Sequence, residues 1–186
     1  MRAFIGIDFS DEIKNEIVEA QNKIKVYADG GRWTQPDNFR LALKYLGVIS
    51  TDQMEQIKTT LGNICSGKMP FDVAISGLWT FDDKDLVKFL WLGLSGELDQ
   101  LRSIQTEVDS ALLPLGFQPE KRGFAPHVTI GQDIIFKSDF KQIEAELGHI
   151  QLSTMKVKSL YLFESEHVQD QRVYRKIAEF SFAPKA

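Results

Sequence analysis

The chain has 186 residues, of which 43% are hydrophobic and 26% charged, and its formal net charge is −4 at pH 7. These values predict one globular domain or two closely packed lobes, and they argue against a protein that coats nucleic acid through a broad basic surface. They still allow a small cleft that holds one phosphate, because a few local donors suffice there.

Other features of composition limit the compartment and the cofactors. The only cysteine, Cys65, excludes an internal disulfide and predicts a cytoplasmic protein, with the thiol packed in a helix rather than reactive. No apolar run approaches the roughly 20 residues that span a membrane. Because the sequence has no CxxC, HExxH or glycine-rich phosphate loop, we expect neither a metal nor another cofactor.

Hydrophobic periodicity predicts alternating strands and helices in the first part of the chain. In order, we expect a strand at residues 3–9, a helix capped by Ser10 and ended by residues 29–31, a loop at 33–38, a strand at 39–46, and a helix capped by Ser50 or Thr51.

The remainder predicts a hairpin, two helices and three further strands. We expect strands at residues 71–81 and 87–94 joined by a turn at 82–84, a helix at 96–113, a strand at 126–131, a short helix at 139–147, and strands at 155–164 and 172–182.

This order resembles a diverged duplication, in which residues 39–46 align with residues 126–131. Mixed helices and paired strands of this kind favour the α+β class, with helices outside antiparallel sheets. We therefore expect residues 1–186 to form a single domain of two intertwined, pseudo-symmetric lobes whose sheets line a central cleft.

The best candidate catalytic residue lies in Phe124-Ala-Pro-His-Val-Thr-Ile-Gly131. Strand alternation places His127 and Thr129 on one face, and Val128 and Ile130 on the other. A histidine beside a hydroxyl is suited to proton transfer next to a phosphate or carbonyl oxygen. A single His-x-Thr is common, however, and taken alone it favours an ordinary histidine on a sheet.

A second stretch changes this interpretation. Arg32-Trp-Thr-Gln-Pro-Asp-Asn-Phe-Arg-Leu-Ala-Leu-Lys-Tyr-Leu-Gly47 resembles the first signature region of the two-histidine phosphoesterases, and the His127 stretch resembles the second. The opening residues 2–8 and the chain length are also similar to those of the RNA 2′,3′-cyclic phosphodiesterases, long called 2′-5′ RNA ligases (LigT-like proteins). The resemblance runs end to end, but only the two signature regions are specific.

The resemblance implies a metal-independent hydrolase, in which water opens a 2′,3′-cyclic phosphate at an RNA end to leave a 2′-phosphate. One histidine accepts a proton from water and the other donates one to the departing 3′ oxygen, each step being worth about 10²–10⁴ in rate. By this resemblance His127 is the proton acceptor and Thr129 donates to a phosphate oxygen. The implied partner is an RNA 3′ end or a nucleotide with a cyclic phosphate, without membrane or metal, and we expect a monomer.

The first motif departs from the family pattern, because Arg40 stands at the histidine position and Ala42 at the hydroxyl position. An arginine cannot donate a proton near neutral pH, although its planar fork binds phosphate well. The family also often has arginines at the positions of Ala125 and Gln132. We therefore expect weak or lost turnover.

Two alternatives stay open at this point. One is a non-catalytic protein that binds a nucleotide or RNA-terminal phosphate through Arg40, Thr129 and His127. The other is a two-histidine phosphoesterase for a different cyclic phosphodiester, such as a cyclic nucleotide derivative or ADP-ribose 1″,2″-cyclic phosphate.

Several other residues have expected structural roles. Trp33 is expected to anchor a loop to the core, and Tyr174 to pack in the last strand. Lys44 shares the parity of Arg40 and is expected either at the cleft or in solvent. His149 and His167 are expected on the surface.

Overall fold

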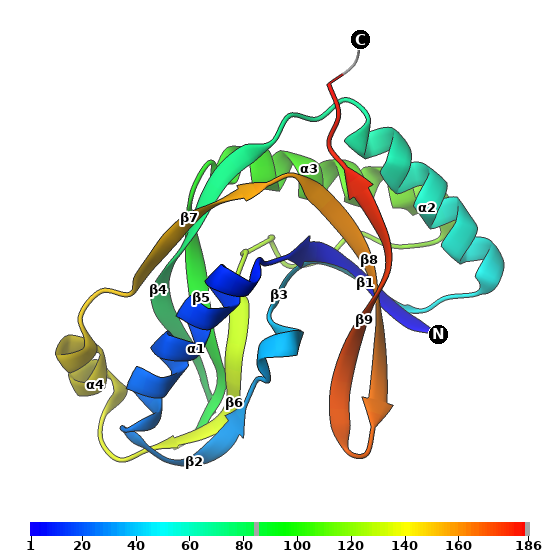
Figure 1. The fold of residues 1–186 in the computed structure, drawn as a ribbon. Coiled ribbons are helices and arrows are strands. Elements are labelled where there is room, and N and C mark those ends of the chain that lie inside the picture. The colour runs from blue at the N-terminus through cyan, green and yellow to red at the C-terminus, as the bar shows by residue number, and fades with distance from the viewer. Residues whose placement is uncertain (84–85, 185–186) are drawn as a thin grey trace.

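Within residues 1–83 and 86–184, which the computed structural model describes, the strands form two antiparallel sheets (Figure 1). One sheet has the strand order β3-β1-β8-β9 and the other the order β2-β6-β5-β4-β7. The strands are β1 (Arg2–Asp8), β2 (Ala28–Trp33), β3 (Arg40–Val48), β4 (Phe71–Asp83), β5 (Leu86–Gly96), β6 (Val128–Phe136), β7 (Gln151–Val157), β8 (Ser159–Val168) and β9 (Gln171–Ser181).

The helices lie on the sheets as the α+β class requires. They are α1 (Asp11–Lys25), α2 (Thr51–Cys65), α3 (Leu98–Leu112) and α4 (Phe140–Leu147), with short 3-10 turns at Pro36–Asn38 and Leu113–Leu115. In Figure 1, α2 and α3 lie beside one another along the four-stranded sheet, where α2 contacts β8 and β9 and α3 contacts β3. Helix α1 packs against β2 and β7 of the other sheet. No helix in the described ranges is both long and apolar enough to cross a membrane.

Local sequence explains where the first two helices begin. The hydroxyl of Ser10 accepts a hydrogen bond from the amide of Ile13 at 3.3 Å. Ser50 and Gln53 form a reciprocal capping box, in which each side chain bonds to the backbone amide of the other. Both arrangements satisfy amide groups that a helix start leaves unpaired. The cap at Ser10 was expected, and Ser50 is one of the two residues expected for the second cap.

The chain passes from one sheet to the other and back. Strands β1 and β3 belong to the four-stranded sheet, whereas β2, which lies between them in sequence, belongs to the five-stranded one. Strands β4 to β7 complete the second sheet, and β8 and β9 return to the first. The α+β class with antiparallel sheets is confirmed, and strands from distant parts of the sequence meet in each sheet.

The prediction was wrong for residues 28–33. Helix α1 ends at Lys25, and residues 28–33 form β2 at the edge of the five-stranded sheet rather than a helix end and loop. Gly31 has φ +143°, and a Cβ there would clash with the side chain of Ile134 on β6. The glycine therefore serves a close strand contact, although its composition resembles that of a loop.

The predicted strand at 155–164 was also wrong in part. It comprises the end of β7 and the start of β8, which belong to different sheets and are separated at Lys158. The hairpin of β4 and β5 is confirmed, with Trp79 opposite Trp91 and Phe81 opposite Phe89. Position 84 of its predicted turn lies outside the described residues.

Candidate active site

His127 directly precedes β6, and two contacts fix its ring. Its Nδ1 lies 2.8 Å from the carbonyl oxygen of Ala125. A carbonyl oxygen only accepts, so this hydrogen bond places the proton of the neutral ring on Nδ1 and leaves Nε2 with its lone pair. The ring also packs on the indole of Trp91, with centroids 4.3 Å apart. His127 is thereby oriented with Nε2 as a proton acceptor.

Thr129 lies two residues further along, on the same side of the strand. Val128 and Ile130 are fully buried, whereas His127 and Thr129 are half-buried. Thr129 stands opposite Trp91 in the β5–β6 register. The predicted alternation is confirmed, although the strand itself begins one residue after His127.

Arg40 is the first residue of β3 and is held inside the protein. Its side chain is 8% exposed, and Nη1 lies 3.0 Å from the Asp8 carboxylate and 2.6 Å from the Phe39 carbonyl oxygen. The guanidinium carbon lies 5.0 Å from the centre of the Phe163 ring. Its buried Nε has no hydrogen-bond partner within the described part of the chain. Part of the planar fork is therefore already engaged.

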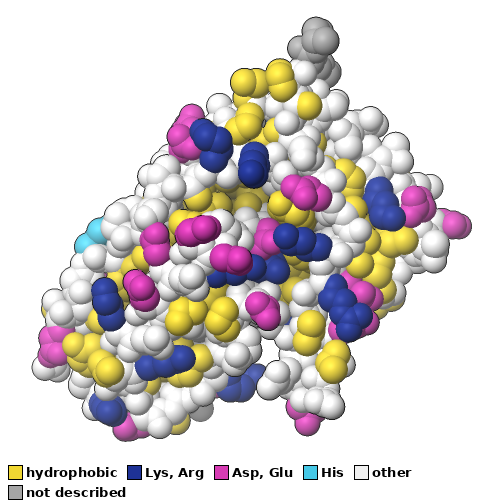
Figure 2. Space-filling model, in the orientation of Figure 1, with side chains coloured by type: hydrophobic (Ala, Val, Ile, Leu, Met, Phe, Trp, Pro, Cys, Tyr) yellow, Lys and Arg dark blue, Asp and Glu magenta, His cyan; other side chains and the backbone are white. Residues whose placement is uncertain are grey.

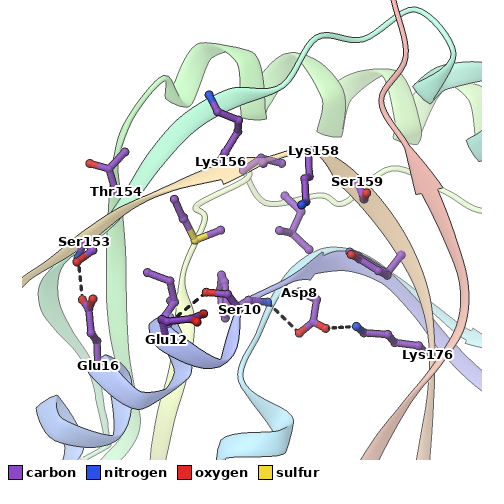
Figure 3. A pocket seen from close by; sticks show the side chains of 16 residues that line it. Asp8, Ser10, Glu12, Glu16, Ser153, Thr154, Lys156, Lys158, Ser159 and Lys176 are labelled. Atoms are coloured by element: carbon purple, nitrogen blue, oxygen red, sulfur yellow. Dashed lines mark hydrogen bonds and ion pairs between the residues drawn. The ribbon is translucent and has the colours of Figure 1, made fainter.

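Asp8, at the end of β1, joins three elements through ion pairs. Besides Arg40, it contacts Lys14 of α1 at 3.3 Å and Lys176 of β9, as Figure 3 shows for the Lys176 contact. Burial alone would raise the pKa of Asp8, but the hydrogen bond from Lys176 and the charges of Arg40 and Lys14 outweigh it, so the pKa lies below its ordinary value. We call Asp8, Lys14, Arg40 and Lys176 the Asp8 cluster. It contains more cations than carboxylates.

Two effects on the pKa of Arg40 oppose one another. Burial lowers its pKa, while the carboxylates of Asp8 and Asp37 act to raise it, and burial prevails. A buried cation in this setting depends on its carboxylate partner, because an unpaired charge away from water is costly.

Ala42 follows two residues after Arg40 on the same strand. It stands opposite Gly6 of β1 and is half-buried. Its methyl group offers no donor to a ligand, in contrast to the hydroxyl of Thr129.

Strands β3 and β6 contact each other even though they belong to different sheets. Arg40 is the first residue of β3 and Val128 the first of β6. The two sequence motifs therefore occupy equivalent places, at the starts of two neighbouring strands.

A cavity of about 630 Å³ adjoins the Asp8 cluster. It lies between the start of α1, β7 and β8, and side chains of both signs line it, including Glu12, Lys158 and Lys176 (Figure 3). Figure 2 shows acidic and basic side chains intermixed over this face. The excess of positive charge thus belongs to the Asp8 cluster rather than to the whole cavity.

Sequence reasoning missed Asp8 and Trp91, and it placed Lys44 wrongly. Lys44 is 2% exposed, pairs with Asp109 of α3 and donates to the Gln118 carbonyl oxygen at 2.8 Å. The β1–β3 register shifts between Ile5 and Gly6, which reverses the parity between Ala42 and Lys44. A local pattern gives no signal for such a bulge.

The other candidates lie where they were expected. His149 and His167 are exposed, and they contact Ser76 and Arg172 respectively. Cys65 is buried, and burial raises the pKa of its thiol to about 11, so it is packed rather than reactive. Tyr174 packs against Phe4, and Trp33 packs against the core, although it does so from β2 rather than from a loop.

Comparison with known proteins identifies the family of the chain. Residues 41–169 match the 2′-5′ RNA ligase superfamily. The RNA 2′,3′-cyclic phosphodiesterase of Methanocaldococcus jannaschii is 25% identical over 183 residues, which cover 97% of this chain and 100% of that protein. The one from Aquifex aeolicus is 31% identical over 131 residues, covering 70% of this chain and 69% of that protein.

Solved structures share the fold over the whole length. The protein TT0787 of Thermus thermophilus superposes with a TM-score of 0.83 at 18% identity, covering 100% of both chains. Escherichia coli LigT complexed with 3′-AMP superposes with a TM-score of 0.79 at 20% identity, covering 97% of both chains.

Fold and site together define a two-sheet α+β protein of the LigT-like kind, with a histidine–threonine pair at the start of β6. The chain belongs to the 2′-5′ RNA ligase superfamily, and its relatives are named RNA 2′,3′-cyclic phosphodiesterases. The resemblance inferred from the two motifs is confirmed.

Proposed function

We propose that the protein acts on 2′,3′-cyclic phosphate ends of RNA, hydrolysing them slowly to 2′-phosphates. The observation that carries this proposal is the hydrogen bond between His127 Nδ1 and the Ala125 carbonyl oxygen, which leaves Nε2 as a proton acceptor. The relatives named as RNA 2′,3′-cyclic phosphodiesterases support the choice of substrate.

In the proposed reaction, Nε2 of His127 accepts a proton from water as the water oxygen bonds to phosphorus. The bond from phosphorus to the 3′ oxygen then breaks, and the 2′-phosphate remains. The Thr129 hydroxyl donates to a non-bridging oxygen, where negative charge grows in the transition state. The excess positive charge of the Asp8 cluster stabilises this growing negative charge at longer range.

Arg40 and Ala42 account for slow turnover. The departing 3′ oxygen needs a proton, and a guanidinium does not supply one near neutral pH. Solvent must provide it instead, which costs about 10²–10⁴ in rate compared with a positioned acid. Ala42 supplies no donor for the phosphate, so its side of the site lacks the hydroxyl that the family pattern has there.

A second candidate function is binding without turnover, of a nucleotide or an RNA-terminal phosphate. The ion pair between Arg40 and Asp8 favours it, because the group at the acid position has become a fixed charge. A different cyclic phosphodiester, such as ADP-ribose 1″,2″-cyclic phosphate, is the other substrate to test.

We further propose that residues 1–186 work as one cytoplasmic, monomeric domain of two intertwined lobes. The lone buried Cys65 supports the compartment. The passage of the chain from one sheet to the other and back supports the single domain.

The test compares wild-type protein with His127→Ala on a cyclic-phosphate-ended oligonucleotide and on ADP-ribose 1″,2″-cyclic phosphate, without added metal. His149→Ala is the control, because that exposed ring contacts Ser76 instead. We expect slow release of a 2′-phosphate that is lost in His127→Ala and kept in the control. Saturable binding without turnover would favour the second candidate. If the protein shows neither binding nor turnover, both candidate functions are overturned.

A further inference from the structure

A strip of aromatic side chains runs along the β4–β5 hairpin to the candidate site. It consists of Trp79, Phe81, Phe89 and Trp91, which we call the aromatic strip. Trp79 pairs with Trp91 and Phe81 with Phe89 in the strand register, so all of them share one face of the sheet.

The strip is continuous with His127. The Trp91 ring lies 4.3 Å from the His127 ring, 6.1 Å from Phe89 and 6.5 Å from Phe81, measured between centroids. The interplanar angles are 20° with Phe89 and 27° with Phe81. Thr129 stands opposite Trp91 and Gln132 opposite Phe89 on β6, so the strip and the proposed phosphate site occupy one surface.

The far part of the strip is open to solvent. Trp79 is 63% exposed and Phe81 is 48% exposed. Exposed aromatic side chains grouped on one face of a sheet, beside a candidate site, are typical of surfaces that bind a partner or ligand. Packing of the protein does not require them there, because the opposite face of the hairpin supplies the core through Leu78, Leu90 and Leu92.

The backbone holds the Trp79 ring in place. A Cβ at Gly93 of β5 would lie 2.8 Å from Nε1 and 3.2 Å from Cδ1 of the indole. The ring therefore rests on a strand that has no side chain at this point, with much of its surface free. A ring fixed in this way loses little freedom when it stacks on a flat ligand.

We propose that the aromatic strip binds unpaired nucleotides that lie 5′ of the terminal phosphate, so that the protein prefers single-stranded RNA ends over mononucleotides. The inference rests on the proposed function for the position of that phosphate beside His127. Bases stack on aromatic side chains of a sheet in other RNA-binding proteins, without regard to base identity. A stacked base strengthens binding by about 5- to 100-fold.

The test measures dissociation constants by calorimetry for oligouridylates of one, two and four nucleotides with a 3′-phosphate. A tetranucleotide with a 3′-hydroxyl is measured beside them. Wild type is compared with Trp79→Ala/Phe81→Ala and with Met69→Ala, a control that removes a side chain of similar exposure (64%) outside the strip. Circular dichroism confirms that each variant is folded.

We expect the affinity of wild type and Met69→Ala to rise with oligonucleotide length. In Trp79→Ala/Phe81→Ala the advantage of the tetranucleotide over the mononucleotide should fall by about 5- to 100-fold for each base that loses its ring. An equal advantage in variant and wild type overturns the inference. So does a wild-type affinity that is independent of length, or a variant that splits a dimer in sedimentation without changing RNA affinity.

Failure of the proposed function looks different. If the 3′-hydroxyl tetranucleotide binds through Trp79 and Phe81 but the 3′-phosphate mononucleotide does not bind, the aromatic strip stands and the phosphate site falls. If no oligonucleotide binds at all, both fall.

Discussion

The starts of β3 and β6 occupy equivalent places in the fold but hold their leading side chains differently. His127 is half-buried, and its ring contacts two neutral groups, the Ala125 carbonyl oxygen and the Trp91 ring. Arg40 is 8% exposed and lies against the Asp8 carboxylate. The first arrangement leaves a nitrogen free for proton transfer, and the second fixes a permanent charge. Two strands in equivalent places can therefore carry different chemistry, because the leading side chain of β3 pairs with a carboxylate and that of β6 contacts neutral groups.

Rebuilding the first motif tests most directly the difference in chemistry between the starts of β3 and β6. In Arg40→His/Ala42→Thr, the new imidazole would lie near Asp8, whose negative charge favours the protonated, proton-donating form. We expect kcat on a 2′,3′-cyclic nucleotide to rise by about 10²–10⁴ over wild type. Ala42→Thr alone, which adds a hydroxyl without an acid, should gain much less. A double variant no faster than the single one would mean that position 40 does not reach the leaving oxygen.

Removing the charge beneath Arg40 should destabilise the protein. In Asp8→Asn, Arg40 remains in a mostly buried place without its carboxylate, and breaking such a pair costs about 3–5 kcal/mol. Urea denaturation measures the loss. Asp133→Asn is the matched control, because its ion pair with Arg32 is largely exposed and should cost at most about 1 kcal/mol. Equal losses in the two variants would show that the Asp8 cluster is a surface feature.

Thr129→Val removes the hydroxyl from the β6 half while keeping the side-chain shape. We expect kcat to fall by about 10²–10³, as when one donor to a developing negative charge is deleted. Thr129→Ser, which keeps the hydroxyl, should retain most of the activity. An unchanged kcat in Thr129→Val would assign the phosphate contact to another group.

Acid should weaken the ion pairs of Asp8 and so lower the free energy of unfolding. The pKa of Asp8 in the folded protein lies below its ordinary value, so its ion pairs contribute fully above the unfolded-state pKa of about 3.9. That contribution is lost as the pH falls through the lowered folded-state value. Urea midpoints should therefore drop from pH 6 to pH 3 more steeply in wild type than in Asp8→Asn. Parallel curves would remove Asp8 as the source.

Local patterns in the sequence sufficed for much of the fold. The helix caps and the β4–β5 hairpin depend on residues close in sequence. The cap at Ser10 and the hairpin were predicted, and Ser50 was one of the two residues predicted for the second cap. Strand β2 was missed because residues 29–31 have the composition of a turn, while Gly31 is required by close contact with Ile134. The division between β7 and β8 was missed because an apolar pattern does not show which sheet a strand joins.

The site residues likewise include some that a local pattern reveals and others that only strand pairing brings together. His127 and Thr129 were found because their spacing and flanking residues form a motif. Asp8 and Trp91 were not, since Asp8 meets Arg40 only through the β1–β3 pairing and Trp91 meets His127 only through the β5–β6 pairing. A single charged residue at the end of an apolar strand was the available signal for Asp8.

The pH dependence of hydrolysis tests most directly whether the site has a base but no acid. It is measured as kcat/KM on a cyclic-phosphate-ended oligonucleotide, for wild type and for Arg40→His/Ala42→Thr. The wild-type value should rise with pH and then stay level, because the site holds a proton acceptor and uses no protein acid. The rebuilt variant should show a bell-shaped profile, since it has both a base and an acid. A bell-shaped profile in wild type would reveal a protein acid at the start of β3 and contradict the account.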